Sequence, residues 1–180
     1  MDILAHSLWA GAGLALARRH VAIARRTAVA TIVLAALPDL LHLLPILAWW
    51  LFGDGSLAMA LAYATALPGQ APALPPLVNL LSHHLHCIAH SAVVAATVTL
   101  LRWAMRGSLW IPLLGWWSHI IIDVFTHSAD FYPSPALYPL TYRGFDGLAW
   151  NTPWFMLLNY AALAAVFLWM ALARQRPFKP

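Results

Sequence analysis

Long apolar stretches separated by short polar segments are the main pattern along this chain of 180 residues. A membrane-spanning helix needs about 20 mostly apolar residues. By this length criterion, the pattern predicts helices at roughly 3–17, 27–52, 77–101, 108–127 and 153–173, of which the first is short. We therefore expect an all-α protein: a polytopic transmembrane bundle of about five spans, forming a single membrane-embedded domain over residues 1–180.

Two segments between these spans break the pattern. The apolar piece at 57–67 is too short to span easily, and the prolines and glycine that follow it end any helix. It predicts one short helix that is interfacial or re-entrant, and the pattern leaves open whether this piece spans. The stretch 128–152 holds three prolines and two glycines and predicts an ordered loop.

The composition supports a membrane protein. The chain is 62% hydrophobic and 9% charged, whereas a soluble domain is about 25% charged. Its net charge is +4, but nine of its ten Lys and Arg form three groups at the ends of apolar runs, at 18–26, 102–106 and 174–179. Such a distribution carries topology information and does not indicate a nucleic-acid surface.

Five spans with an external N-terminus place all three basic groups on the cytoplasmic side, and only Arg143 falls elsewhere. We expect a multi-pass membrane protein with a cytoplasmic C-terminus. The single cysteine, Cys87, cannot form an intramolecular disulfide and says little about the redox compartment.

Seven ionisable residues fall within the apolar runs: His6, Asp39, His42, His86, His90, His119 and Asp123. Such residues are costly in hydrocarbon and mark functional sites. At about 1.5 Å of rise per residue, all seven lie roughly 18–24 Å above the cytoplasmic ends of their spans. They form one layer from four spans, toward the periplasmic side of a core about 30 Å thick.

The spacing of these residues is typical of metal ligands on helices. His86 and His90 share a face, as do His119 and Asp123, with Asp39 and His42 three residues apart. Imidazole and carboxylate together suit zinc or a similar divalent ion, and seven ligands allow one to three ions. Asp39 and Asp123 are the candidates for a catalytic base or a bridging ligand. Possible additional site residues are His83, His127, Asp130, Arg143 and Asp146.

Four motifs carry a family resemblance. The stretch AHSLWAG at 5–11 is similar to T-H-x-L-x-G, LPDLLH at 37–42 to L-P-D-x-D-H, HCIAHS at 86–91 to H-R-G-x-T-H-S, and SHIIIDVFT at 118–126 to S-H-x-x-x-D-x-x-T. In this order they resemble the bacterial inner-membrane metal-dependent hydrolases of the YdjM type, once catalogued as a domain of unknown function. The chain departs from the motifs at Leu41 and at 87–89. The H-x-x-x-D element is more distantly similar to zinc-dependent phospholipase C and related helical multi-zinc nucleases.

The resemblance implies a membrane-embedded metal-dependent hydrolase that uses metal-activated water, acting on a phosphoester or lipid-linked substrate at the outer leaflet. The alternative is a transport protein that passes metal ions or protons through the same cluster. A haem-binding electron carrier is a further alternative, which the carboxylates disfavour. The sequence does not decide the substrate or the oligomeric state.

Overall fold

The computed structural model describes residues 1–130 and 132–174, and this part of the chain holds helices and no strand. The helices are α1 (Ile3–Ala17), α2 (Arg25–Phe52), α3 (Leu57–Ala64), α4 (Pro76–Ala89), α5 (Ala92–Arg106), α6 (Leu113–Thr126) and α7 (Pro153–Arg174). The all-α prediction is confirmed. The short helix expected at 57–67 is α3, which ends a turn earlier than its apolar run.

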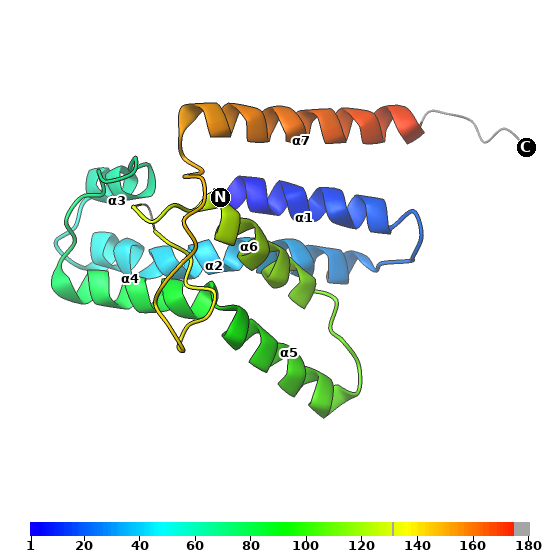
Figure 1. The fold of residues 1–180 in the computed structure, drawn as a ribbon, viewed down its shortest axis with the longest axis horizontal. Helices are drawn as coiled ribbons and strands as arrows, with labels where there is room; N and C mark the ends of the chain where they lie inside the picture. The colour runs from blue at the N-terminus through cyan, green and yellow to red at the C-terminus, as the bar shows by residue number, and fades with distance from the viewer. Residues whose placement is uncertain (131, 175–180) are drawn as a thin grey trace, which may run out of the picture.

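Helix α2 is the centre of the arrangement, and it contacts α1, α3, α4 and α6. In Figure 1 the turn after α1, the turn before α6 and the end of α7 lie toward the right, whereas the loop between α6 and α7 lies toward the left. The helices therefore run back and forth along one direction, as a bundle of spans requires. The tail at 175–180, which holds two of the basic residues used to orient the bundle, lies outside the described residues.

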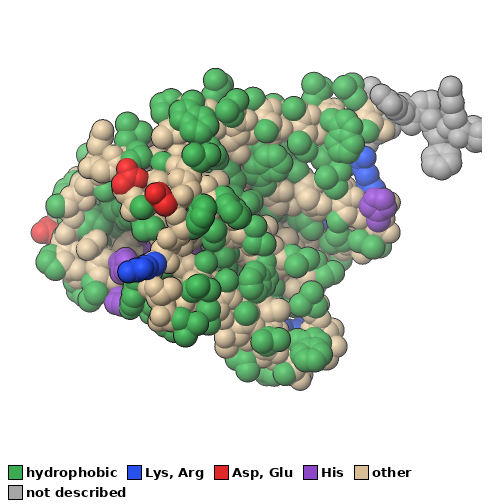
Figure 2. Space-filling model, in the orientation of Figure 1, with side chains coloured by type: hydrophobic (Ala, Val, Ile, Leu, Met, Phe, Trp, Pro, Cys, Tyr) green, Lys and Arg blue, Asp and Glu red, His purple; other side chains and the backbone are tan. Residues whose placement is uncertain are grey.

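Two helices, α2 and α7, are long and apolar enough to cross a membrane, and the pair α4 and α5 makes a third span if counted as one. With 15 and 14 residues, α1 and α6 are apolar but shorter. Hydrophobic side chains cover much of the face in Figure 2, and most of the charged side chains visible there lie toward its two ends. The structure thus shows two to three candidate spans, and the five-span topology stays a prediction.

The expected span at 77–101 is not one continuous helix. It breaks at His90 and Ser91, where α4 and α5 are bent by 57°. The Ser91 side chain caps α5 by accepting a hydrogen bond from Val94 N (3.1 Å), and it donates one to Tyr138 O. Ala92 N donates to Ala136 O (2.8 Å). The long loop therefore supplies the hydrogen bonds that a broken helix needs, which apolar periodicity alone does not reveal.

Gly115 lets α6 cross close to α2. A Cβ at this position would lie 2.0 Å from the carbonyl oxygen of Thr31, far inside van der Waals contact. The next turn of α6 carries His119, whose Nδ1 lies 2.7 Å from Ala35 O on α2. The glycine therefore sets the helix separation at which His119 reaches the α2 backbone.

We predict that Gly115→Ala destabilises the protein by about 1–3 kcal/mol or more, because the added methyl group must push α6 away from α2. The measurement is the thermal unfolding midpoint of the detergent-purified protein. Gly13→Ala is the control, because a Cβ at Gly13 meets nothing within 4 Å. Equal midpoints for the two variants would contradict the close crossing of α2 and α6.

Candidate metal centre

Four side chains from three helices converge at the middle of the bundle. Asp39 comes from α2, His90 from the end of α4, and His119 and Asp123 from successive turns of α6. One ligand atom from each lies within 4.8 Å of all the others. His90, His119 and Asp123 are completely buried, and the Asp39 side chain is 17% exposed.

The separations between these atoms fit a single ion. His90 Nε2 and His119 Nε2 are 3.0 Å apart. They lie 3.5 and 3.7 Å from Asp39 Oδ1, and 3.3 and 3.1 Å from Asp123 Oδ2. Four ligands arranged tetrahedrally at zinc distances of about 2.0–2.2 Å are about 3.3–3.6 Å from one another. The five separations given above lie close to these values.

Hydrogen bonds fix which ring nitrogens face the centre. Nδ1 of His119 lies 2.7 Å from Ala35 O, and Nδ1 of His90 lies 2.9 Å from His86 O. A carbonyl only accepts, so each Nδ1 carries a proton and each Nε2 faces the centre. Carbonyl partners of this kind orient metal-binding histidines in many proteins.

The centre gathers two carboxylates and two imidazoles, and the Met1 amine contacts the carboxylate of Asp123. No Lys or Arg in residues 1–130 and 132–173 forms an ion pair with Asp39 or Asp123. The Oδ2 atoms of both aspartates are buried and receive no hydrogen bond. Carboxylate oxygens removed from water need a cation or a hydrogen-bond donor, and an ion among the four side chains would supply the positive charge that these two oxygens lack. The group can hold a metal ion.

Three further groups surround Asp123. His6 Nε2 lies 2.8 Å from Asp123 Oδ1, and its ring stacks on His119 at 3.8 Å. The Met1 amine also contacts Asp123 Oδ1. His127 lies one turn beyond, with Nδ1 3.1 Å from Asp123 O.

His42 and His86 lie beside the four-residue group rather than in it. The His86 ring is tilted against that of His90, with centroids 4.0 Å apart. The centroid of the His42 ring lies 5.3 Å from that of His86. His86 Nε2 is buried and receives no hydrogen bond. Among the described residues, no other three ligand atoms lie as close together as those of the four-residue group. Additional ions held by His42 and His86 stay a prediction.

Four of the possible additional residues lie apart from the centre. His83 is exposed and contacts Cys87 and the ring of Tyr142. Asp130 and Asp146 are exposed and accept hydrogen bonds within the loop, from Ser128 Oγ and from Ala129 N. Arg143 is exposed on the same loop. Of the additional candidates, only His127 reaches the buried group.

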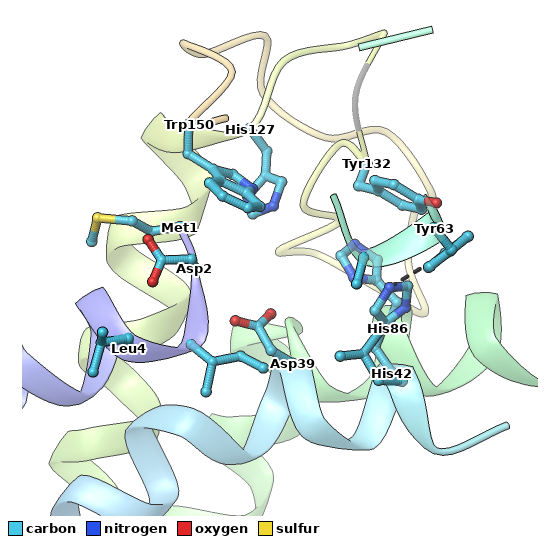
Figure 3. A pocket seen from close by; sticks show the side chains of 13 residues that line it. Met1, Asp2, Leu4, Asp39, His42, Tyr63, His86, His127, Tyr132 and Trp150 are labelled. Carbon is cyan, nitrogen blue, oxygen red and sulfur yellow. Dashed lines mark hydrogen bonds between the residues drawn. The ribbon is translucent and has the colours of Figure 1, made fainter. Parts of the chain in front are cut away.

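A cavity of about 290 Å³ opens beside the centre (Figure 3). Asp39 and His42 form its floor, His127 and Trp150 lie opposite, and the first residues of α1 form one side. The other side contains Tyr63 and Tyr132, which sequence reasoning missed. No pattern in the sequence marks these tyrosines, because only the tertiary structure brings α3 and the long loop to the cavity.

No family model matches the chain, and no curated protein or solved structure matches it. The resemblance to the YdjM-type hydrolases therefore stays a prediction that depends on the four motifs. The case for a metal centre is made by the geometry of the four side chains.

We predict that His90→Ala and His119→Ala each lower the affinity of the purified protein for zinc at least tenfold, because each removes one of four converging ligand atoms. Elemental analysis after dialysis against a weak chelator measures the metal retained. His83→Ala is the control, because this histidine is exposed and lies outside the group. A wild-type protein that is folded but retains no divalent metal would contradict the assignment.

Proposed function

We propose that the protein is a membrane-embedded metal-dependent hydrolase whose ion, most naturally zinc, is held by His90, His119 and Asp123, with the carboxylate of Asp39 beside it. The observation that carries the proposal is the convergence of two imidazoles and two carboxylates, without a Lys or Arg partner among the described residues, next to a cavity that reaches the surface. A divalent ion in such a group supplies Lewis acidity and lowers the pKa of water toward neutrality.

Asp39 differs from the other three residues in a way that suits catalysis. It is the only one of the four that lines the cavity, and its carboxylate points into that space (Figure 3). Catalytic zinc sites commonly use three protein ligands and leave one position open. We assign the three fully buried residues as permanent ligands, and Asp39 as the group that accepts the proton of the attacking water.

Transport is the alternative, and it uses the same side chains. A transporter must also release the ion from the cluster along a second path, on the side away from the cavity. The structure instead ties the Nδ1 atoms of His90 and His119 to backbone carbonyls, and Gly115 packs α6 directly on α2. These features favour a fixed ion over a mobile one.

We predict that Asp39→Asn retains the bound metal but lowers hydrolysis about 10²–10⁴-fold, because the amide cannot accept the proton. The measurement is release of product from a panel of chromogenic phosphoesters and carboxylic esters by zinc-loaded protein. Asp146→Asn is the control, because this aspartate is exposed on the loop. Absence of hydrolysis, together with zinc flux into proteoliposomes that His90→Ala abolishes, would favour the transporter.

We place the protein in the bacterial inner membrane with the loop after α6 on the periplasmic side, because this orientation puts the basic turns in the cytoplasm. In a Cys87→Ser background, Leu140→Cys is then labelled by an impermeant maleimide added to intact spheroplasts. Ala22→Cys, in the turn after α1, is labelled only after lysis. Both residues are exposed, and the reverse labelling pattern would overturn the orientation.

A further inference from the structure

The cavity beside the metal centre opens between α1 and α3. Of the thirteen residues that line it, Leu4 on α1 and Ala64 on α3 are exposed, whereas the others are buried or half-buried. Both helices contact α2, and they do not contact each other. Leu43 of α2 lines the cavity as well. The rim of the opening is therefore formed by apolar side chains from three helices.

One side of α2 is apolar and exposed along most of its length. Between residues 27 and 51, the exposed large side chains of this helix, here called the outer stripe, are those of Val29, Val33, Leu40, Leu44, Leu47 and Leu51. At about 100° per residue, all of them fall within roughly 60° of the helix circumference. Since α2 is long and apolar enough to cross a membrane, the outer stripe is the side that a spanning α2 turns to the hydrocarbon of the bilayer.

The cavity lies along one edge of the outer stripe. Around the circumference of α2, Leu43 follows Leu47 by about 40°, and Asp39 follows Leu43 by about 40° more. Leu47 is 36% exposed, and Leu43 is half-buried and lines the cavity. The carboxylate of Asp39 points into the cavity (Figure 3). Apolar side chains therefore lead from the outside of the bundle to the candidate metal centre.

The three helices around the opening carry few charges. Neither α1 nor α3 contains Lys, Arg, Asp or Glu, and the apolar part of α2 contains only Asp39. Asp2, which also lines the cavity, caps α1 by accepting a hydrogen bond from Ala5 N (2.9 Å). Counted from Arg25, Leu43 lies roughly 27 Å along α2, within a hydrocarbon core about 30 Å thick. In the proposed orientation, the opening thus faces the outer part of the hydrocarbon.

We propose that the opening between α1 and α3 is a lateral entrance through which a lipid ester of the bilayer reaches the metal centre, with its acyl chain along the outer stripe. The occupant is a membrane lipid because the opening is continuous with the surface that α2 turns to the acyl chains. An ester that enters past Leu43 brings its polar part beside Asp39 while its chain stays in hydrocarbon. The inference rests on the proposed function for the fate of the ester, whereas the entrance depends only on the position of the opening.

The test is photocrosslinking of the full-length, zinc-loaded protein in nanodiscs. The probe is a phosphatidylglycerol that carries a diazirine on the first carbons of one acyl chain, and its adducts are mapped by mass spectrometry. We expect adducts at Leu43 and Tyr63 inside the cavity, as well as at Leu44 and Leu47 on the outer stripe. Ala64→Trp should abolish the adducts inside the cavity and leave those on the outer stripe, because the indole fills the opening.

Ala62→Trp is the matched control, because Ala62 is exposed on the same helix and does not line the cavity. Wild-type adducts confined to the outer stripe overturn the proposal, even if a variant fails to fold. So do cavity adducts that Ala64→Trp leaves unchanged, and so does an outer stripe without adducts, because lipid then does not cover this side of α2.

The result also separates this inference from the proposed function. Cavity adducts that Ala64→Trp abolishes, in a protein that hydrolyses no ester, support the lateral entrance and contradict the hydrolase. Hydrolysis of soluble esters, together with adducts confined to the outer stripe, does the reverse.

Discussion

The placement of two carboxylates in an apolar bundle, without a Lys or Arg partner among the described residues, is the constraint on which the structure depends. Asp39 and Asp123 lie in an apolar bundle where an uncompensated charge is very costly. The helices around them supply imidazoles, and the Met1 amine contacts Asp123. An ion bound by this group would be coupled to the folding of the bundle.

The packing of the bundle brings the residues of this centre together. Gly115 brings α6 onto α2, and the break after His90 turns the chain so that the long loop closes over the site. The loop also covers the end of α6, where Gly147 N and Leu148 N donate to His127 O and Phe125 O. The loop thereby positions Trp150 and Tyr132 at the cavity, and one side of the metal centre stays accessible while the others are buried.

The cavity makes the centre accessible from one side. Asp39 is the only one of the four converging residues that faces it, and the tyrosines lie across the same space. The candidate metal centre is therefore open toward the cavity on the side of Asp39, whereas its other three residues are completely buried.

The sequence by itself determined the apolar helices and the set of ionisable residues, because both depend on local periodicity and on the cost of charge in hydrocarbon. Six of the seven helices begin or end close to the expected positions, and the buried group consists of residues that their spacing had marked. Only the tertiary structure decided the break at His90 and the separation of His42 and His86 from the four-residue group. The same holds for the close helix crossing at Gly115 and for the place of Tyr63 and Tyr132 at the cavity. Each of these depends on contacts between segments far apart in the chain, and no spacing along one helix records such contacts.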